Sequence, residues 1–479
     1  MRGLILFVMM FCVACTQQPY SGIDAPSNSR PATDGAIISY IDQRLEQEYY
    51  WLDEVKQKKT SFNRYLPWTQ YLSHALSKLT TNEDDGSYNS KGQRSYYSYI
   101  RDVTTTRAEK MGFGILLHYT ILIIDDNSHL GFVVESVYPD SAADRAGIKR
   151  GDIITEVDGK FIDNSNYVTH FNNIQSNGVA SLDLSLRRRS DDGVEFDVTL
   201  EREYFDETPI AYYDVFDIKG YDKRIGYLTY LGFESEYNNE LTEVLTSLAS
   251  EGIGELILDL RCNGGGALTS AILLCSAIVP SSYEGKTLCT IERNKNNTVS
   301  SQSSEFKLEN TGQLLNLERV VVICSDYSAS ASELVVMGLR GMDFPVTLIG
   351  ATTEGKNCGM DVTHKRINGK DLEYAPITFM CFNAKGFGDW GEGITPDVDL
   401  TDEGNEYGVY DNYYPLPYAD WGDSKHDIAL AVALAKITGQ SIAQKEISRS
   451  VAEENIAIAE VMARPVVGTR IYKELNVSK

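Results

Sequence analysis

The sequence is poor in positive charge and has no apolar run long enough to cross a membrane. Its 479 residues include 44 lysines and arginines against 68 aspartates and glutamates, which gives a formal net charge of −24. A chain this acidic repels phosphate backbones and no basic run offsets the charge, which argues against nucleic acid as a partner. A spanning helix needs about 20 apolar residues, and the most membrane-like run, Leu4–Ala14, is much shorter.

The sequence also lacks the common zinc-ligand motifs and the serine motif of α/β-hydrolases. The cysteines form no C-x-x-C pair, the six histidines form no H-E-x-x-H motif, and no G-x-S-x-G motif occurs. These absences argue against a zinc hydrolase and against an α/β-hydrolase. Several of the later cysteines lie in apolar runs, where a thiol usually packs as a small buried side chain, although disulfides stay open in an exported protein: Cys262, Cys275, Cys289, Cys324, Cys358 and Cys381.

Residues 1–15 have the shape of a secretory signal, with one early charge, Arg2, before the apolar run. They end in Cys12-Val13-Ala14-Cys15, which resembles a bacterial lipobox. The resemblance implies lipidation of Cys15 and a lipid-anchored place in the bacterial cell envelope. Because no acidic run follows Cys15, we expect an outer-membrane anchor facing the periplasm. An ordinary cleaved signal is the alternative. Residues 16–35 are polar and predict a flexible tether.

The rest of the chain divides into four parts by its pattern. With 42% apolar and 23% charged residues, the chain has the composition of a soluble globular protein. Residues 36–107 carry apolar and aromatic residues at helical spacing and predict a helical N-terminal domain, whereas residues 108–205 predict short strands joined by turns. Strands alternate with helices over residues 206–440, which predicts parallel crossovers, and residues 441–479 predict a polar, helical C-terminal tail. We therefore expect a multidomain α/β protein.

A PDZ-like pattern lies within the second part. Residues Pro139–Ile154 read P-x-S-A-A-x-x-A-G-I-x-x-G-D-x-I, which resembles the PDZ domains of bacterial proteases. The resemblance implies that a Gly-rich loop binds the C-terminal carboxylate of a peptide, which then adds to the sheet as a strand. Gly112, Phe113, Gly114 and Ile115 occupy the place of that loop. A β-domain with a purely structural role is the alternative.

Two other loops combine strand ends with residues suited to catalysis. In the first, a strand ending at Asp259 runs into Gly264-Gly265-Gly266 before a helix, so that backbone N–H groups favour a negatively charged ligand. In the second, Ser328–Glu333 read S-A-S-A-S-E between a strand and a helix. The positive end of that helix dipole favours an alkoxide or an oxyanion.

Together with a later G-K segment, these loops resemble the carboxyl-terminal processing (tail-specific) serine peptidase family. The family carries D-L-R-x-N-x-G-G, S-A-S-A-S-E and G-K motifs in this order behind a PDZ domain, and the resemblance covers roughly residues 108–440. It implies a Clp/crotonase-like α/β serine peptidase core that needs no metal or organic cofactor. It also implies that Ser330 is the nucleophile and Lys356 the general base. Gly265, Gly266 and Ala331 would form the oxyanion hole, and Glu333 and Thr353 would be supporting residues.

One family position differs in this sequence. Members often carry Gln or Glu four residues after the lysine to orient its amine, and this chain has Met360 there. Asp361 or His364 could replace that group, or the site works as a Ser–Lys dyad. A free lysine has a pKa near ~10.4, so the amine must be desolvated before it can take a proton at neutral pH. Residues Gly391–Val398 resemble a later family element, which we interpret as a structural turn.

The sequence thus predicts a serine endopeptidase that acts on polypeptides whose C-termini or exposed tails are captured by the PDZ domain. An inhibitory PDZ domain is equally open. A catalytically inactive peptide-binding scaffold is the alternative function, and an enzyme of the same fold acting on a small acyl substrate is another. Residues Gly350–Asn357 nearly spell a P-loop but end in Asn357 where magnesium binding needs a hydroxyl, which argues against nucleotide binding. Homo-oligomer formation stays open.

Overall fold

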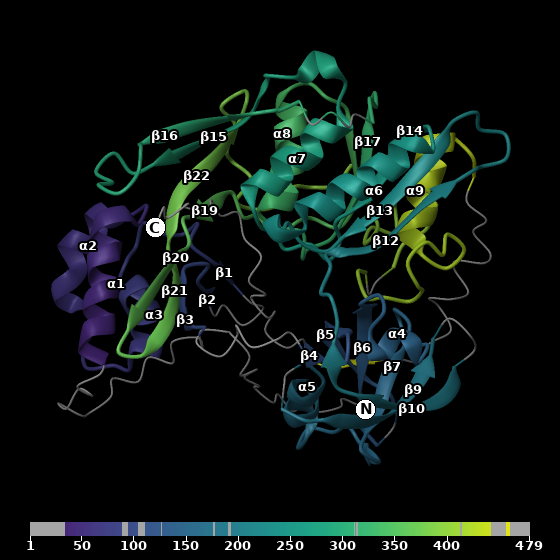
Figure 1. Ribbon diagram of the computed structural model, residues 1–479, viewed down its shortest axis with the longest axis horizontal. Helices are drawn as coiled ribbons and strands as arrows, with labels where there is room; N and C mark the ends of the chain where they lie inside the picture. Colours follow the sequence, from purple (N-terminus) through teal and green to yellow (C-terminus); the bar gives the residue numbers. More distant parts are fainter. Residues whose placement is uncertain are drawn as a thin grey trace.

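The computed structural model describes residues 34–88, 94–103, 111–125, 127–175, 178–189, 193–310, 312, 315–411, 414–441 and 457–459. The predicted signal, the lipidation site Cys15 and all but the last two residues of the predicted tether lie outside these ranges. Figure 1 shows an α/β body, an arm that carries the N-terminal helices, and a smaller β-rich domain. In the described ranges, every helix is too short or too polar to traverse a bilayer.

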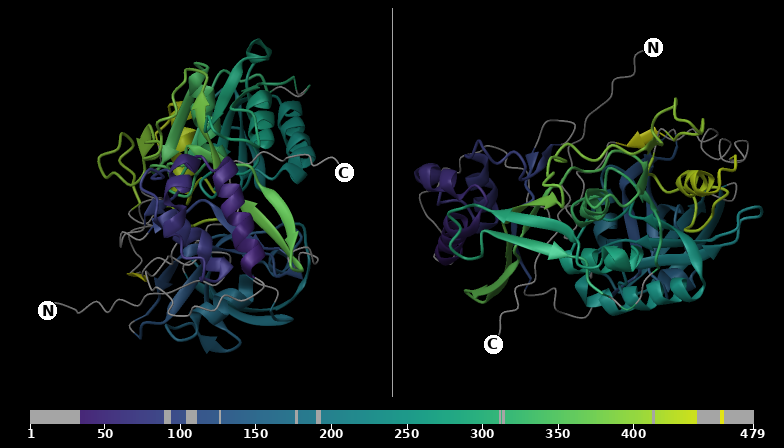
Figure 2. Two further views of the ribbon diagram at one scale, coloured as in Figure 1. Left: turned by 90° about the vertical axis from the view of Figure 1, so that its left-hand side faces the viewer. Right: turned by 90° about the horizontal axis from the view of Figure 1, so that it is seen from above.

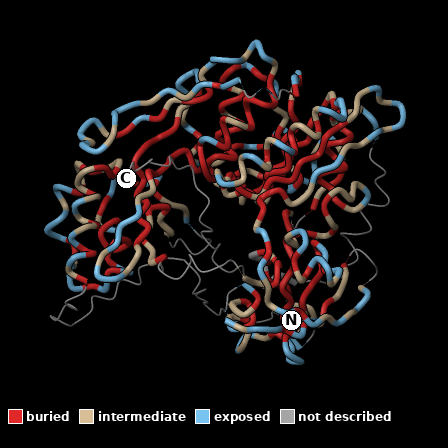
Figure 3. Tube along the Cα trace, viewed as in Figure 1, coloured by how far each residue is buried: buried red, intermediate tan, exposed pale blue. Residues whose placement is uncertain are grey.

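The body is built on a six-stranded sheet in the order β12-β13-β14-β17-β18-β23. Only β12 is antiparallel to its neighbour, and the others run parallel. The parallel strands are apolar and mostly buried, as expected for strands covered on both faces (Figure 3). The expected α/β class is confirmed. The strands are β12 (Ile210–Phe216), β13 (Arg224–Tyr230), β14 (Ile253–Asp259), β17 (Val320–Cys324), β18 (Val346–Gly350) and β23 (Val398–Asp399).

Helices cover both faces of this sheet (Figures 1 and 2). Because neighbouring side chains of a strand point to opposite faces, Leu256 and Leu258 pack in one apolar cluster while Ile257 packs in another. The first cluster includes α6 (Asn238–Ser250), α7 (Leu268–Ile278) and α8 (Ala331–Gly341), and the second includes α9 (Ile428–Thr438). Two short 3-10 turns, η2 (Ser235–Tyr237) and η3 (Ser281–Tyr283), precede α6 and follow α7.

A second sheet extends from the body as an arm, in the order β16-β15-β22-β19. Its strands are antiparallel where their pairing is described. A three-stranded sheet, β20-β21-β3, continues the arm and takes its third strand from the N-terminal part of the chain. The strands of the arm are β15 (Thr287–Arg293), β16 (Ser303–Lys307), β19 (Cys358–Met360), β20 (Thr363–Ile367), β21 (Lys370–Ala375) and β22 (Ile377–Asn383).

The N-terminal helices share one apolar core with this arm. Ile41 and Leu45 pack in the same cluster as Met360 and Tyr374. The helices are α1 (Asp34–Glu48), α2 (Leu52–Lys58), the 3-10 turn η1 (Lys59–Ser61) and α3 (Trp68–Ser77). The helical prediction for residues 36–107 is wrong after α3, where the chain forms β1 (Ser87–Tyr88), β2 (Arg94–Ser95) and β3 (Tyr99–Asp102). The tyrosine-rich sequence favours a strand there, and β21 supplies its hydrogen-bonding partner.

The β-rich domain is a sheet in the order β10-β9-β7-β6-β5-β24, with β8 paired to β7. Two helices pack with it around a separate apolar core, and β4 and β11 form a short ribbon beside it. This arrangement agrees with the expected PDZ domain. Its elements are β4 (Met111–Gly112), β5 (Ile115–Ile123), β6 (Leu130–Val137), α4 (Ala142–Arg145), β7 (Ile153–Val157), β8 (Lys160–Phe161), α5 (Tyr167–Gln175), β9 (Ser181–Arg188), β10 (Val194–Glu201) and β11 (Glu203–Tyr204).

The last strand of that sheet comes from the C-terminal tail. β24 (Ala457–Ala459) pairs antiparallel with β5. The helical prediction for the tail is therefore wrong at these three residues, and residues 442–456 and 460–479 lie outside the described ranges. The local sequence alternates isoleucine with alanine, and a period of two suits a strand wherever a sheet edge is available.

The cysteines of the described residues form no disulfide. Burial raises the pKa of the Cys275 and Cys324 thiols, as expected for small buried side chains. Across the same described ranges, no group of three or more histidine, cysteine, aspartate or glutamate side chains is arranged to hold a metal ion.

Candidate active site

The predicted catalytic residues lie in three loops that follow neighbouring parallel strands. The glycine loop (residues 260–267) follows β14, the nucleophile loop (residues 325–330) follows β17, and the lysine loop (residues 351–357) follows β18. The carboxyl ends of parallel strands meet at one edge of a sheet, so the topology brings the three loops together. The candidate site therefore lies at the carboxyl edge of the body's sheet.

Asn263 ties the glycine loop to the nucleophile loop. Its carbonyl accepts hydrogen bonds from the amide of Ala329 at 3.2 Å and from the hydroxyl of Ser332 at 2.8 Å. Its side chain accepts a bond from the amide of Gly265 at 2.9 Å and donates one to the carbonyl of Tyr230 at 2.8 Å. Asn263 lies in the motif that resembles the family but is not among the predicted site residues.

Ser330 occupies a strained position immediately before α8. Its φ is +62° and its ψ is −111°, a region that L residues rarely adopt, and its side chain is fully buried. Strain of this kind costs of order 1–3 kcal/mol and persists only where surrounding contacts hold it. The hydroxyl of Ser328 donates to the carbonyl of Leu260 at 2.8 Å and that of Ser332 donates to Asn263, whereas the side chain of Ser330 is the acceptor in a capping box with Glu333. Ser330 is thus the serine of this motif that best fits a nucleophile.

Gly265 lies directly against Ser330. Its φ is +109°, and a Cβ placed there would come within 2.7 Å of the Ser330 Cβ and 2.9 Å of the Ala329 carbonyl oxygen. No side chain fits between the two loops at this point. The glycine predicted at this position is therefore required for the close approach of the backbone, whatever its amide does.

The predicted oxyanion-hole amides do not all point the same way. The amide of Gly265 donates to Asn263, as described above. Gly266 forms a parallel bridge with Phe233 through the carbonyl of Gly265 and the amide of Ala267, so its own amide points away from Phe233. Ala331 is the first residue of α8, so its amide has no acceptor within the helix. The geometry favours Gly266 and Ala331 as the two donors.

The carboxylate of Glu333 joins the nucleophile loop to the lysine loop. One oxygen accepts hydrogen bonds from the amides of Ser330 at 2.7 Å and Lys356 at 2.8 Å. The other accepts from the hydroxyl of Thr353 at 2.6 Å and the amide of Gly355 at 2.8 Å. Four donors thus converge on one buried side chain, and the predicted supporting residues Glu333 and Thr353 contact each other directly.

The turn at Gly391–Val398 supports the same loop. The amide of Ile394 donates to the hydroxyl of Thr353 at 2.8 Å, and a Cβ at Gly355 would lie 2.2 Å from the carbonyl of Gly391. Asp397 in this turn accepts bonds from Arg340 and from the amide of Leu348, both at 2.7 Å. The turn therefore holds the lysine loop against the sheet, in line with its interpretation as a structural element.

We expect Glu333→Gln to lower kcat by about 10²-fold with little change in KM, because misplacing a catalytic group by about 1 Å costs this much. The glutamine NH₂ would face two of the four hydrogen-bond donors.

Burial raises the pKa of Glu333 to about 7 against the lowering effect of its hydrogen bonds. The carboxylate therefore gains a proton as the pH falls through 7, and we expect an acid limb in the wild-type kcat profile that Glu333→Gln lacks.

Steady-state kinetics between pH 5 and 9 measure both effects. Glu54→Gln is the matched control, because Glu54 also accepts hydrogen bonds from two backbone amides and two hydroxyls, those of Thr80 and Thr81, but lies in the N-terminal part. Its activity should equal that of the wild type. An unchanged acid limb in Glu333→Gln would assign that limb to another group.

Lys356 is buried, with 2% of its surface exposed. Its amine lies 4.9 Å from the ring centre of Tyr97, which comes from the N-terminal part of the chain. The hydroxyl of Tyr97 donates to Glu354 at 3.2 Å, and burial raises the pKa of this tyrosine well above its usual value. Tyr97 thus covers the lysine loop. No local pattern in the sequence indicated it, because it lies more than 250 residues earlier in the chain.

Neither of the two residues considered as a third catalytic member has a suitable position. The carboxylate of Asp361 accepts hydrogen bonds from the buried guanidinium of Arg293 at 3.0 and 3.1 Å. The side chain of His364 is 59% exposed and lies 3.9 Å from Glu373 on β21. Met360, at the position that differs from the family, belongs to the apolar core of the arm. Neither Asp361 nor His364 therefore replaces the family's orienting residue.

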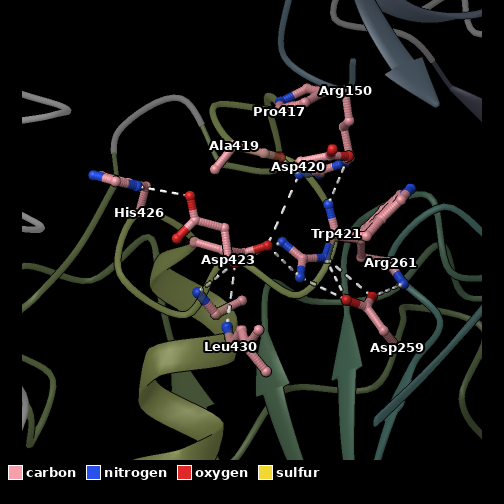
Figure 4. A network of polar contacts seen from close by, with 12 residues as sticks. Arg150, Asp259, Arg261, Pro417, Ala419, Asp420, Trp421, Asp423, His426 and Leu430 are labelled. Carbon is pink, nitrogen blue, oxygen red and sulfur yellow. Dashed lines mark hydrogen bonds and ion pairs between the residues drawn. The ribbon is translucent and has the colours of Figure 1, made fainter. Parts of the chain in front are cut away.

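A buried polar network connects the glycine loop to the β-rich domain (Figure 4). Arg261 lies between two carboxylates, with Asp259 at 2.5 Å and Asp427, the cap of α9, at 2.8 Å. Arg150 of the β-rich domain stacks over the ring of Trp421 at 3.9 Å and donates to the carbonyl of Ala419 at 2.8 Å. The two domains therefore meet through charged groups that are nearly inaccessible to water.

The same contact reaches the glycine loop directly. The thiol of Cys262 donates to Glu135 of β6 at 3.0 Å, and Glu135 in turn lies 3.3 Å from His118 of β5. Burial lowers the pKa of His118. Strands of the β-rich domain thus contact the residue immediately before Asn263, which positions the glycine loop.

The predicted peptide-binding residues form the turn between β4 and β5. Gly112 pairs with β11, and Phe113 is buried in the core of the β-rich domain. The carbonyl of Gly114 accepts a bond from Tyr138 at 2.9 Å, and a Cβ at Gly114 would overlap Ser141. Ile115 begins β5 at the edge of the sheet. The four residues are therefore adjacent to a strand edge, as a peptide-binding loop requires.

Comparison with known protein families matches two separate parts of the chain to two family models. Residues 224–400 match the model of peptidase family S41, and residues 133–169 match that of the PDZ domain. The first match contains the glycine, nucleophile and lysine loops. The second contains β7, β8 and the end of β6.

Among curated proteins, the chain is similar to a "Probable CtpA-like serine protease" of Staphylococcus aureus, with 27% identity over 268 residues, which cover 56% of this chain and 50% of the relative. A protein of the same name from Staphylococcus epidermidis is 25% identical over 406 residues, which cover 83% of this chain and 72% of the relative. The chain thus spans half the length of the first of these relatives.

Among solved structures, the chain resembles that of a protein from Bacteroides fragilis described as a "Putative S41 protease". The TM-score is 0.66 at 20% identity, and the match covers 84% of this chain and 97% of that one. At this identity the likeness establishes the fold.

Proposed function

We propose that this chain, which carries a peptidase family S41 domain behind a PDZ domain, is a serine endopeptidase with a Ser330/Lys356 dyad. One observation supports this most strongly. The carboxylate of Glu333 bonds the backbone amides of Ser330 and Lys356 through the same oxygen, which fixes the two loops to each other. A scaffold that only binds peptides has no need of such a link.

In the proposed reaction, the neutral amine of Lys356 takes the proton of the Ser330 hydroxyl as its oxygen attacks the peptide carbonyl. Burial disfavours a charged ammonium, which keeps an amine available as a base. The amides of Gly266 and Ala331 donate to the oxyanion, and each such donor contributes about 3–4 kcal/mol to the transition state. The lysine then protonates the leaving amine, and water hydrolyses the acyl-enzyme by the same steps in reverse.

The proposed substrates are polypeptides whose C-termini or exposed tails bind the β-rich domain. A peptide that adds to the edge of β5 becomes part of the same sheet as β6, and β6 contacts the glycine loop through Glu135. The sheet that would bind the peptide therefore contacts the glycine loop, which carries part of the proposed oxyanion hole. A small acyl substrate has no use for this domain.

The experiment is to incubate residues 16–479 with an unfolded polypeptide and to identify the products by mass spectrometry. New peptide termini that increase with time would support the proposed function, and their sequences would define the specificity. An intact substrate after prolonged incubation, in a preparation whose serine also fails to react with a fluorophosphonate probe, would contradict it.

We propose further that Cys15 is lipidated and anchors the protein in the bacterial outer membrane, facing the periplasm. The support is the sequence Cys12-Val13-Ala14-Cys15 after a short apolar run. Metabolic labelling with palmitate should mark the parent and the control Cys12→Leu, whereas Cys15→Ala should lose the label and leave the membrane fraction. A parent that takes up no label would instead indicate an ordinary cleaved signal, and label retained by Cys15→Ala would contradict lipidation at Cys15.

A further inference from the structure

The outer edge of β5 is occupied by the chain's own C-terminal segment. β24 pairs antiparallel with the second half of β5, in the register Ala457 with Ile123, Ile458 with Leu122, and Ala459 with Ile121. β5 is otherwise the last strand of its sheet. An exposed edge of this kind readily accepts an additional strand.

The register shows which backbone groups β24 satisfies. The amide of Ile124 donates across the hairpin to the carbonyl of His129 at 2.9 Å, on the side of β6. Successive residues of a strand direct their amides to opposite edges, so the amides of Ile121 and Ile123 point towards β24. The partners at these two positions are alanines, and the amide of Ile458 between them points away from β5.

β24 also has the direction expected of a bound peptide. The edge of β5 begins at the Gly112–Ile115 loop, to which the sequence assigns carboxylate binding. α5 packs beside this edge, where the side-chain amide of Gln175 donates to the carbonyl of Ile115 at 2.7 Å. Because β24 is antiparallel to β5, it runs towards that loop, as does a peptide held there by its C-terminus.

We propose that residues 457–459 compete with polypeptide substrates for the edge of β5, so that a substrate must displace the tail before it is held. The proposal rests on the proposed function only in assigning this edge to the substrate. It also indicates a class of polypeptide for the site, namely an extended, uncharged segment with small residues at the two positions bonded to β5. A tethered competitor acts at an effective concentration of up to about millimolar, so it keeps weak external peptides out.

The test uses the full chain with Ser330→Ala, which removes the proposed nucleophile, and a fluorescein-labelled peptide of residues 453–464 as the probe. Ala459→Pro deletes an amide that bonds β5, whereas Ile458→Pro deletes one that points away and serves as the matched control. By fluorescence polarisation, the probe should bind Ala459→Pro about tenfold more tightly than the parent, and Ile458→Pro should resemble the parent. N-methylation of the probe at Ala459 should weaken binding, and at Ile458 should not.

Hydrogen exchange gives a second measurement. The amides of Ile121 and Ile123 should exchange faster in Ala459→Pro than in the parent, while that of Leu122, which faces β6, should not change. Equal probe affinity in the parent and in Ala459→Pro, or equal exchange at Ile121 and Ile123, would overturn the proposal. Neither measurement needs catalysis. If both give the expected result while the chain with Ser330 intact cleaves no polypeptide, the proposed function alone is contradicted.

Discussion

Ser330→Ala is expected to lower kcat for peptide hydrolysis by about 10⁴- to 10⁶-fold, the range seen when the nucleophile of a serine peptidase is removed. The change deletes one oxygen from a fully buried side chain at the start of α8. The change removes the cap that this oxygen forms with the amide of Glu333, which costs about 1 kcal/mol. The amide of Ser330 keeps its bond to the Glu333 carboxylate, so we expect the fold to persist. Single-turnover cleavage of a fluorogenic peptide measures the loss over this range.

Lys356→Met should produce a loss of similar size. Methionine resembles lysine in length and is apolar, so it fills a buried site without leaving a cavity. When two groups act as a unit, the effects of removing each do not add. The double variant should therefore be little slower than either single variant. An additive double variant would show that the two residues act independently and would contradict the dyad.

Two nearby variants control for disturbance of the fold. Ser332→Ala removes a hydroxyl that bonds Asn263, two residues after Ser330, and should keep activity within about tenfold of the wild type. Lys370→Met removes a lysine of β21 that pairs with Asp102, far from the site, and should leave kcat unchanged. A loss in Ser332→Ala as large as that in Ser330→Ala would remove the case for Ser330.

Gly265→Ala is the second variant with a large expected effect. The new Cβ would lie 2.7 Å from the Ser330 Cβ, closer than two carbon atoms can approach, and the backbone φ of +109° is itself unfavourable for alanine. The glycine loop must therefore move away from the nucleophile loop. Because Gly266 follows directly, the displacement also moves an oxyanion donor, and we expect kcat to fall by about 10²- to 10³-fold.

Gly252→Ala is the control that separates the effect of backbone strain on stability from the effect of a displaced glycine loop on kcat. Gly252 also has a positive φ, +69°, but a Cβ there would meet nothing within 4 Å. Its alanine variant should lose some stability in thermal unfolding and keep its kcat. If Gly265→Ala lowered the melting temperature no more than Gly252→Ala and left kcat unchanged, the glycine loop would have no part in catalysis.

The sequence motifs predicted the parts of the site that are local. Ser330, Glu333 and Thr353 were assigned from short patterns, and the described contacts place all three within one hydrogen-bonded group. The sheet was predictable for the same reason, since an apolar strand followed by a loop and a helix is a local signal. Local patterns do not show which amide points where, so the different orientations of Gly265 and Gly266 became visible only in the fold.

The long-range contacts could not be predicted. Tyr97 covers the lysine loop, and Arg150 stacks on Trp421 across the domain contact, but neither residue lies in a motif that indicates its partner. The strand at β24 was missed because a three-residue strand depends on the open edge that it joins. Three residues carry too little pattern to distinguish a strand from a helix when their partner, β5, is more than 300 residues away.

The core shared by the N-terminal helices and the arm has a consequence for the order in which the protein matures. During synthesis, the N-terminal part of the chain leaves the ribosome long before its partners. Tyr40 of α1 bonds a residue 323 positions later, and Tyr97, just before β3, bonds one that is 257 positions later. A nascent chain that ends soon after Ser330 therefore lacks both Lys356, the proposed base, and the packing of Tyr97 over that lysine. Under the proposed mechanism, the site is complete only when β19 to β22 have been made, and we expect a growing chain to be inactive until then.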